Sequence, residues 1–439
     1  MIVPQIPKGF RDFLPEKMIV RQKAISLMTT VFERFGFEPL DTPCIEYAET
    51  LEGKYGEEGE KLIYKFQDRG ERNVALRYDL TIPLCRVMAM HPEITKPFKR
   101  YHIAPVWRAD KPQKGRFREF YQCDIDIIGS SSIYADGELL VITYYVLKEL
   151  GFTNFMMRIN NRKILNAFAL KEGIADKDAA AFLRSLDKLD KIGTEGVLKE
   201  LSEKGLLVGN LESKFKALTV PNAGLNTVRL NEMKNLVQGI PLGDEGIHEL
   251  EIIYETLAAH DVPEDCYLFD FTLARGLDYY TGPIFETLVR EPKIGSITGG
   301  GRYDNLIGLF TKEPVPATGT SFGLERILTV MEELGSQKQK TALTQVLITA
   351  FDSTLMSRNL RIAKMLRDAE IKTELYFSPD KLKKQMSYAS SRSIPFVAIL
   401  GPDEDRDGKI TLKNMAAGTQ ATIPQETLVE TIQKSLLVA

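Results

Sequence analysis

The spacing of apolar residues predicts a first helix, then a strand-rich region, then a second helix. Apolar side chains recur at helical spacing over residues 25–35, and Gly36 follows where a glycine commonly ends a helix. Residues 98–128 are instead rich in Tyr, Phe, Ile and Val. Their polar break at 110–118 is typical of antiparallel strands joined by a long loop. A second helix is expected from 136 to 150, where apolar residues again share one face.

The pattern changes after Asn160. Residues 161–261 are rich in Ala, Leu, Lys and Glu, which predicts a helical insertion. Strand-like sequence resumes at 266–273, and the glycine-rich segment 295–301 leads to a helix that ends near Gly335.

The last part of the chain predicts a small α/β domain. Short strands are expected at 346–350, 373–377 and 396–400, with a helix between the first two, which favours a largely parallel sheet. The expected organisation is therefore a discontinuous α+β domain with an antiparallel sheet (1–160 and 262–335), a helical insertion (161–261), a polar linker (336–344) and a C-terminal α/β domain (345–439).

Composition supports a globular protein and excludes several classes. The 439 residues suggest roughly three domains, and 44% hydrophobic with 27% charged residues is too apolar for a disordered chain. No stretch reaches the roughly 18 apolar residues of a membrane span, and the first residues do not resemble a signal peptide. The four cysteines lie far apart without a C-x-x-C pair, so we expect reduced thiols and a cytoplasmic protein.

The net charge of -3 provides no general cationic field, so any contact with nucleic acid must rest on local patches. Residues 107–126 offer one such patch. Five basic residues there are interleaved with Phe117, Phe120 and Tyr121, and Asp124 and Asp126 follow on the returning strand. Guanidinium groups and aromatic faces suit phosphates and bases, whereas a solvated charged hairpin would show the same composition. A second basic cluster lies at 381–384.

Three further segments could carry chemistry. Residues 275–282 place an Arg-Gly pair before two tyrosines, 299–304 and 318–326 combine glycines with arginines, and 76–83 place Asp79 two residues before Thr81 on one face of an extended segment. No P-loop pattern is present. Each segment also has a purely structural alternative. Residues 275–282 could form a turn with packed aromatics, Arg326 could be a surface arginine, and Asp79 could take part in a local ion pair. The four histidines lie at no spacing that argues for a catalytic triad or a metal site.

Taken in this order, the segments resemble the class II aminoacyl-tRNA synthetases, and within them the histidyl-tRNA synthetase family. The resemblance begins at residues 7–15 and covers nearly the whole chain. The helix ending at Gly36 resembles motif 1, residues 108–126 resemble motif 2, and 323–326 resemble motif 3. Residues 275–282 resemble the histidine-specific motif of that family.

The resemblance implies activation of L-histidine by ATP and transfer of the histidyl group to the 3′-terminal adenosine of tRNA(His). It also implies a homodimer and Mg²⁺ that accompanies ATP, bound mainly through phosphates with support from Glu or Asp, while no metal-ligand residues are assigned. Arg108 would hold the α-phosphate and the substrate carboxylate, and Phe120 would stack on adenine. Asp110 and Arg326 complete the implied ATP site.

The implied histidine site consists of Asp79, Thr81, Gln122, Asp126, Tyr279 and Tyr280. The first three would receive the α-ammonium group. Asp126 and Tyr280 would bond the two imidazole nitrogens, and such polar complementarity rejects apolar analogues by about 10⁴ or more. The commoner bacterial pattern has Glu in place of Asp79, Asp110 and Asp126, so this chain resembles the family branch with Asp at these positions.

Arg275 is the residue expected to act in catalysis together with Arg108. Charge accumulates on the α-phosphoryl oxygens during carboxylate attack, and a fixed guanidinium stabilises that state more than the ground state.

Three rival functions stay open: a histidine-sensing regulatory subunit of ATP phosphoribosyltransferase, a class II synthetase for glycine, proline or threonine, and an RNA-binding protein without catalysis. The first usually loses the anticodon domain and this arginine, whereas this chain has both.

Overall fold

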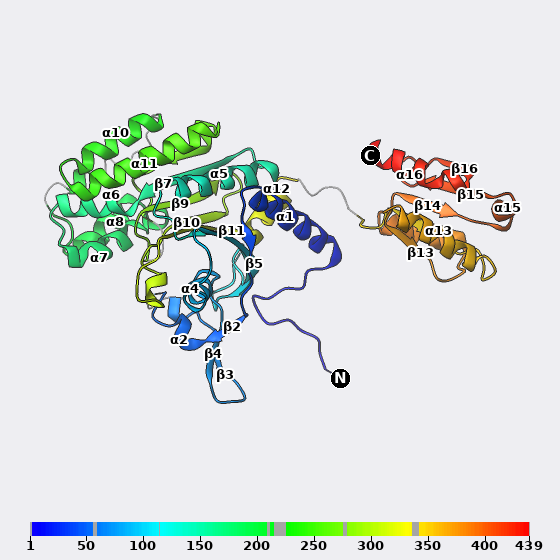
Figure 1. Cartoon of the computed structure of the whole chain (residues 1–439), viewed down its shortest axis with the longest axis horizontal. Coiled ribbons are helices and arrows are strands. Elements are labelled where there is room, and N and C mark those ends of the chain that lie inside the picture. Colours follow the sequence, from blue (N-terminus) through cyan, green and yellow to red (C-terminus); the bar gives the residue numbers. More distant parts are fainter. Residues whose placement is uncertain are drawn as a thin grey trace. The chain divides into compact units, whose positions relative to one another are not determined.

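The computed structural model describes residues 2–55, 59–113, 115–208, 211–214, 225–274, 279–335 and 342–438 (Figure 1). The chain forms two compact units. The first comprises residues 1–12 and 23–336, and the second comprises 13–22 and 337–439. Among the described helices, none has both the length and the apolar character needed to cross a membrane.

An eight-stranded sheet forms the centre of the first unit. Its strands lie in the order β1 (Glu38–Pro39), β5 (Phe98–Trp107), β6 (Glu119–Ile128), β11 (Ala317–Gly323), β10 (Thr298–Arg302), β9 (Pro283–Val289), β7 (Phe155–Asn161) and β8 (Tyr267–Phe269). Only the outer pairs β1–β5 and β7–β8 are parallel, and the other neighbours are antiparallel. The expected antiparallel sheet is therefore confirmed, with one parallel strand added at each edge.

One face of this sheet is covered by helices, which leaves the other face for a site. Along β6, Cys123, Ile125 and Ile127 join the apolar core together with α1 (Pro15–Arg34) and α5 (Tyr134–Glu149). Side chains alternate along a strand, so the polar residues between them point to the opposite face. A polar row on β6 thus lies on the side of the sheet away from α1 and α5.

The region after β7 is helical, as its composition predicts. Its helices are α6 (Arg162–Lys171), α7 (Asp176–Leu186), α8 (Leu189–Glu203), α10 (Asn226–Val237) and α11 (Pro241–Ala259), which group together in Figure 1. Helix α11 packs on both α5 and α6, and these helices share one apolar core with the large sheet. The boundaries of a separate insertion at 161–261 stay a prediction.

The remaining elements of the first unit are smaller. They are the three-stranded sheet β2 (Ile45–Tyr47), β4 (Asn73–Leu76) and β3 (Lys65–Gln67), the helices α2 (Ala48–Leu51), α4 (Thr81–Met90) and α12 (Leu324–Glu333), and the 3₁₀ turns η1 (Glu264–Cys266) and η2 (Ile307–Leu309).

Two expectations for the first unit need correction. The strand predicted at 266–273 ends at Phe269, because Asp270 turns the chain by accepting a hydrogen bond from the backbone N–H of Thr272 at 2.9 Å. The glycine-rich segment does not lead directly to a helix, because its last residues belong to β10 and a further strand, β11, follows before α12. Glycine is required there, since a Cβ on Gly300 would lie 2.1 Å from the carbonyl oxygen of Gly319.

The second unit contains a five-stranded sheet in the order β13 (Thr373–Leu375), β12 (Val346–Ile348), β14 (Phe396–Ile399), β15 (Lys409–Asn414) and β16 (Gln420–Pro424). Its helices are α13 (Met356–Asp368), α14 (Leu382–Ser391), α15 (Pro402–Arg406) and α16 (Leu428–Val438), and η3 spans Gln425–Thr427. The three expected strands, β12, β13 and β14, are parallel to one another. Strand β15 is antiparallel to both of its neighbours, β14 and β16, so the sheet is mixed. A hairpin with no crossover helix joins β15 to β16, as is usual for antiparallel neighbours.

Candidate active site

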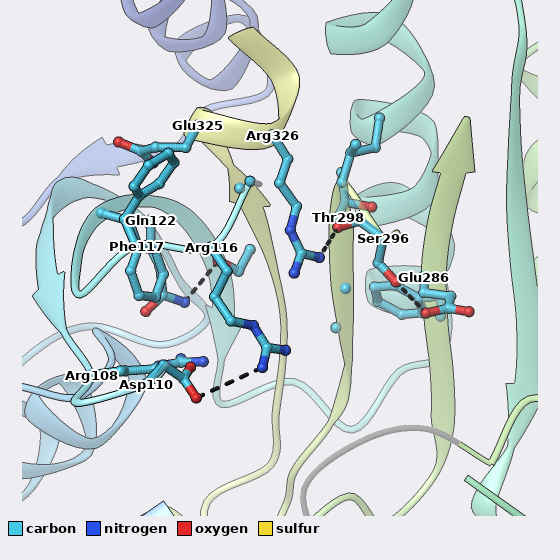
Figure 2. Close-up of a pocket in the computed structure, with 18 of the residues that line it drawn as sticks. Arg108, Asp110, Arg116, Phe117, Gln122, Glu286, Ser296, Thr298, Glu325 and Arg326 are labelled. Atoms are coloured by element: carbon cyan, nitrogen blue, oxygen red, sulfur yellow. Dashed lines mark hydrogen bonds and ion pairs between the residues drawn. The ribbon is translucent and has the colours of Figure 1, made fainter. Parts of the chain in front are cut away.

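A cavity of about 320 Å³ opens on the polar face of the large sheet. Its walls come from the β5–β6 loop, from β6, β9, β10 and β11, and from the first turn of α12. The lining residues are Arg108, Asp110, Gly115, Arg116, Phe117, Phe120, Gln122, Tyr280, Phe285, Glu286, Ser296, Ile297, Thr298, Gly299, Gly300, Ser321, Gly323, Glu325 and Arg326. In Figure 2, Arg108 and Arg116 extend from the β5–β6 loop into the same space as Arg326, which comes from α12.

The guanidinium group of Arg108 is fixed before any ligand arrives. Its Nε donates to the carbonyl oxygen of Tyr78 at 3.1 Å. The group also lies over two aromatic rings, 4.2 Å from the centroid of Tyr78 and 5.1 Å from that of Phe120. These contacts use the inner nitrogen and the flat face of the group, so both terminal nitrogens remain available for a planar pair of hydrogen bonds to an anion.

The loop between β5 and β6 is anchored by the N-terminal segment. The backbone N–H of Arg118 donates to the carbonyl oxygen of Gly9 at 2.9 Å, and Gly9 has a φ of +91°. The guanidinium of Arg11 lies 3.2 Å from the ring centroid of Phe117 and 3.7 Å from a carboxylate oxygen of Glu325. The segment that resembles the family's N-terminal signature thus supports two residues of the cavity wall.

A chain of contacts joins α12 to the opposite wall. Arg326 Nη1 donates to the carbonyl oxygen of Ser296 at 2.6 Å, and the Ser296 hydroxyl donates to Glu286 (Figure 2). The other oxygen of Glu286 accepts a hydrogen bond from Arg158 Nη1 at 2.9 Å. Arg326 therefore sits among groups that orient it, in the first turn of a helix whose amino end favours anions.

Three buried aspartates lie close enough to influence one another beside this cavity. Asp79 accepts hydrogen bonds from the hydroxyl of Tyr55 at 3.2 Å and from the backbone N–H of Ile82 at 3.0 Å. Burial raises the pKa of Asp79, and burial likewise raises the pKa of Asp124 and Asp126. Each carboxylate therefore depends on its local partners to remain charged.

The side chain of Asp126 is held by protein groups. Its Oδ2 lies 2.7 Å from Nη2 of Arg100, and its Oδ1 accepts a hydrogen bond from the hydroxyl of Tyr303. A Cβ on Gly319 would lie 1.9 Å from Asp126 Oδ1, so that glycine makes room for the carboxylate. The expected role of Asp126 at the imidazole ring stays a prediction.

The two tyrosines of the histidine-like motif pack against each other with ring centroids 4.9 Å apart. Tyr280 lines the cavity, whereas Tyr279 packs on Tyr303 at 5.9 Å. Burial, followed by the nearby Asp126 and Asp124, raises the pKa of the Tyr280 phenol. That hydroxyl consequently stays protonated and can serve as a hydrogen-bond donor.

Of the predicted site residues, six line the cavity: Arg108, Asp110, Phe120, Gln122, Tyr280 and Arg326. Asp79, Thr81, Asp126 and Tyr279 do not line it, and Arg275 lies outside the described residues. The expected extended segment at Asp79 and Thr81 is wrong. Thr81 begins α4, because the Asp79 carboxylate satisfies a backbone N–H of the first helical turn.

Sequence reasoning missed several lining residues, chiefly Glu286, Ser296, Thr298 and Glu325. Glu286 had a usable signal, since it is the one charged residue in the apolar strand β9. Glu325 accepts a hydrogen bond from the backbone N–H of Tyr121 at 3.0 Å and thereby ties α12 to β6. Only the fold brings α12 next to β6, so spacing along the chain could not reveal the contact between Glu325 and Tyr121.

Comparisons with known proteins agree with this geometry. A family model described as histidyl-tRNA synthetase matches residues 9–327, and one described as an anticodon binding domain matches 345–435. A histidine--tRNA ligase from Bacteroides fragilis (strain YCH46) is 43% identical over 455 residues, covering 98% of this chain and 99% of the relative.

Solved structures show the same relationship. The crystal structure of histidyl-tRNA synthetase from Nostoc sp. PCC 7120 matches with a TM-score of 0.89 and 30% identity, covering 99% of this chain and 100% of that one. An ATP phosphoribosyltransferase regulatory subunit/histidyl-tRNA synthetase from Bacillus halodurans C shares the fold, with a TM-score of 0.76 and 22% identity over 91% of this chain and 99% of that one.

The antiparallel sheet, its arginine-lined cavity and the separate α/β unit define a class II aminoacyl-tRNA synthetase, an aminoacyl-tRNA ligase. More specifically, the match over residues 9–327 and the full-length relatives show that the chain belongs to the histidyl-tRNA synthetase family.

Proposed function

We propose that the protein is a histidine–tRNA ligase, which activates L-histidine with ATP to histidyl-adenylate and transfers the histidyl group to the 3′-terminal adenosine of tRNA(His). The observation that carries this function is the cavity itself. Arginines from opposite walls face one space, and the buried polar residues Gln122, Asp124 and Asp126 lie on the same face of β6. Family membership supports the same reaction.

The decisive experiment is ATP–pyrophosphate exchange with each of the twenty amino acids. Histidine alone should stimulate exchange, because a pocket with buried polar groups discriminates strongly against side chains that leave those groups unpaired. Stimulation by glycine, proline or threonine would assign a different synthetase. No stimulation would favour the regulatory subunit, although the chain's match to an anticodon-binding model over 345–435 argues against that alternative.

ATP would occupy the arginine-rich part of the cavity. Arg108 would bind the α-phosphate and the histidine carboxylate with its two terminal nitrogens, while Phe120 stacks on adenine. Arg326 would meet the adenine ring and the γ-phosphate side of ATP from the first turn of α12. Asp110, 3.7 Å from Arg116, would place that second loop arginine beside the nucleotide.

Mg²⁺ is expected to arrive with ATP. Within the described residues no group of three or more His, Cys, Asp or Glu side chains could hold a metal alone, which suits an ion carried mainly by phosphates. Glu286 fits as a protein ligand, since its carboxylate lines the cavity and is oriented by Ser296 and Arg158. When bound, the ion would reduce the negative charge of the phosphates.

Arg275 would stabilise the charge that develops on the α-phosphoryl group. We predict that Arg275→Ala slows adenylate formation by orders of magnitude, as expected from losing about 3–4 kcal/mol of transition-state stabilisation. Rapid-quench measurement of adenylate formation tests this, with the thermal unfolding midpoint as the control for folding. Activation kinetics near those of the wild type would rule out this role.

tRNA(His) is the proposed macromolecular substrate. The loop at 110–118 would meet its acceptor end, and the second unit its anticodon. In that unit Phe351 and Phe377 follow the neighbouring strands β12 and β13, with exposed fractions of 57% and 81%. Exposed aromatic rings near the basic cluster at 381–384 suit stacking on unpaired bases.

We also propose a homodimer, in agreement with the motif 1 resemblance. The sheet β2–β4–β3 exposes apolar side chains, since Tyr47 and Phe66 flank Val74 in one cross-strand row and are 51% and 44% exposed. Light scattering should report twice the 49.5 kDa mass of one chain. Substituting both Tyr47 and Phe66 with Asp should lower that mass toward one chain, because charges oppose apolar association.

The matched control for this pair is Phe377→Asp, an equally drastic change of an exposed aromatic in the second unit. It should leave the mass at two chains. An unchanged mass in the Tyr47/Phe66 variant would place the interface elsewhere.

A cytoplasmic location is proposed with the same function, since all four cysteines are free, as expected in a reducing compartment.

A further inference from the structure

The N-terminal segment at residues 7–12, which we call the strap, has no role in the function proposed above. It belongs to the same compact unit as the large sheet. The carbonyl oxygen of Gly9 accepts the backbone N–H of Arg118 at 2.9 Å, and the carbonyl oxygen of Lys8 accepts Nη1 of the same arginine at 3.3 Å. Arg118 Nε donates to the carbonyl oxygen of Asp110 at 3.1 Å. One arginine therefore fastens the strap to both ends of the β5–β6 loop.

Arg11 extends from the strap to two other elements. Its guanidinium carbon lies 3.2 Å from the ring centroid of Phe117 in the loop, and its Nη2 lies 3.7 Å from Oε1 of Glu325 in the first turn of α12. The side chains of Arg11 and Glu325 are 31% and 4% exposed, so much of their contact is shielded from water. A cation over an aromatic face is attracted to it, and more strongly where water is excluded. Arg11 thus joins the loop to α12.

The two elements that Arg11 joins both belong to the proposed ATP site. Phe117 and Glu325 line the cavity, and so does Arg326 of α12 (Figure 2). The loop and the helix meet beside Arg326, since a Cβ at Gly115 would lie 3.7 Å from the Cγ of Arg326. Arg11 does not itself line the cavity. It therefore supports this wall from outside the space that the nucleotide would occupy.

Hydrogen bonds within the loop fix the shape of its tip but not its position over the cavity. Gln113 and Arg116 exchange two backbone hydrogen bonds of 3.1 and 2.9 Å, and the carboxylate of Asp110 lies 3.7 Å from Arg116 Nη1. All three residues belong to the loop itself. Contact with α12 sets the position of the loop, and Arg11 strengthens that contact from the strap. A loop held in this way is ordered before the nucleotide arrives, so its ordering does not oppose binding.

We propose that Arg11 is a positioning residue for ATP, which holds the β5–β6 loop against α12 in the arrangement that binds the nucleotide. It acts through Phe117 and Glu325 and does not touch the substrate. The inference rests on the proposed histidine–tRNA ligase function and gives the strap a part in it. If only a fraction of the molecules has the binding arrangement, the apparent affinity for ATP falls by that fraction. Removing Arg11 therefore weakens ATP binding, whereas ATP that is already bound reacts as in the wild type.

The first test measures histidine-dependent pyrophosphate exchange in Arg11→Ala. The KM for ATP should rise roughly 5- to 30-fold, the range that corresponds to losing a shielded cation–aromatic contact together with an ion pair. The KM for histidine and the kcat at saturating ATP should stay within about twofold of wild type. The matched control is Arg406→Ala, which removes an exposed arginine paired with Asp403 at 3.0 Å in the second unit. A KM for ATP within about twofold of wild type, or an equal rise in both KM values, would overturn the proposal.

A double-mutant cycle tests whether Arg11 acts through the loop. Replacing Phe117 with alanine removes the ring on which Arg11 stacks, so Arg11→Ala should raise the KM for ATP less in that background than in the wild type. Residues in contact show such non-additivity, whereas independent residues do not. Additive effects of the two substitutions on the KM for ATP would overturn the role of the loop.

Hydrogen exchange tests the position of the loop without any need for catalysis. In Arg11→Ala, peptides covering 110–118 should exchange faster than in the wild type, because the amide of Arg118 loses its protection when the strap and the loop separate. Peptides from β7 and α5 should exchange as before, which a general loss of stability would not allow. The concentration of ATP, added with Mg²⁺, that restores protection should rise by the same factor as the KM for ATP. Unchanged exchange at 110–118 would overturn the proposal.

Arg11→Lys provides a second variant if Arg11→Ala does not fold. Lysine keeps the charge beside Glu325 but lacks the flat guanidinium, so its effects should have the same direction and be smaller. A wild-type protein without histidine-dependent pyrophosphate exchange would overturn the ligase function, and the hydrogen-exchange titration with ATP would still decide the role of Arg11. An active wild type whose Arg11 variants show normal KM values and normal hydrogen exchange at 110–118 would overturn the positioning role alone.

Discussion

Replacing Arg108 with alanine should slow histidine-dependent adenylate formation by roughly 10²–10³-fold or more, the usual effect of losing one preorganised donor in such a site. Arg108 is held by Tyr78 through a 3.1 Å hydrogen bond and lies over the rings of Tyr78 and Phe120. Because this guanidinium needs no reorganisation, it can stabilise phosphoryl charge throughout the reaction. Single-turnover adenylate formation measures the effect.

Arg108→Lys distinguishes geometry from charge. Lysine keeps the positive charge but lacks the planar fork and stacks poorly, so this variant should also be strongly impaired. The matched control is Arg72→Ala, which removes an exposed arginine whose carboxylate partner is Asp68. Its activation rate should equal that of the wild type. Full activity in Arg108→Lys would show that charge alone suffices.

Replacing Arg158 with methionine should lower the free energy of unfolding by about 3–5 kcal/mol, the range for removing one partner of a buried ion pair. Arg158 contacts Asp270 at 2.7 Å, Glu286 at 2.9 Å and Asp190 at 3.0 Å. Methionine fills similar volume but leaves Asp270 and Glu286 without their cation. Equilibrium chemical denaturation, followed through the unfolding transition of the first unit, measures this loss of unfolding free energy.

Burial alone would favour the protonated form of Asp270, yet Arg158 and Thr272 lower the pKa of its carboxyl. The stability from this pair is therefore present at neutral pH and is lost as pH falls through the folded-state pKa. Asp190→Asn is the matched control, since Asp190 is 65% exposed and should cost at most about 1 kcal/mol. A loss below 1 kcal/mol in Arg158→Met would mean that the ion pairs of Arg158 contribute little to the stability of the first unit.

Sequence patterns predicted best those elements with a strong compositional signal. Strands β5 and β6 were predictable because two segments rich in Tyr, Phe, Ile and Val flank a polar loop. The first ten residues of α1 were not predictable from apolar spacing, since that helix begins at Pro15, well before the amphipathic part. Strand β16 was missed because a strand that is exposed along most of its length carries little periodic signal. Strand β15 was missed although its buried Ile410 and Leu412 alternate with polar residues.

The candidate site shows a similar division. Residues in contiguous motifs, such as Arg108, Phe120 and Arg326, could be found from their neighbours along the chain. Glu286 stands out as the one charged residue of the apolar strand β9, but its place in the cavity could not be predicted, because that place depends on the antiparallel pairing of β9 with β10. The ion pair between Arg100 and Asp126 is likewise a property of packing, since sequence alone does not reveal which aspartate Arg100 contacts.

The contact between Arg11 and Glu325 joins residues that are made at opposite ends of the synthesis of the first unit. During translation the N-terminal segment leaves the ribosome long before α12 exists, and domains acquire their long-range contacts only when the chain that forms them has emerged. A nascent chain shorter than about residue 325 therefore lacks one wall of the cavity and the contact that orders Phe117. We therefore expect translation products that end before about residue 325 to lack the activation of histidine by ATP.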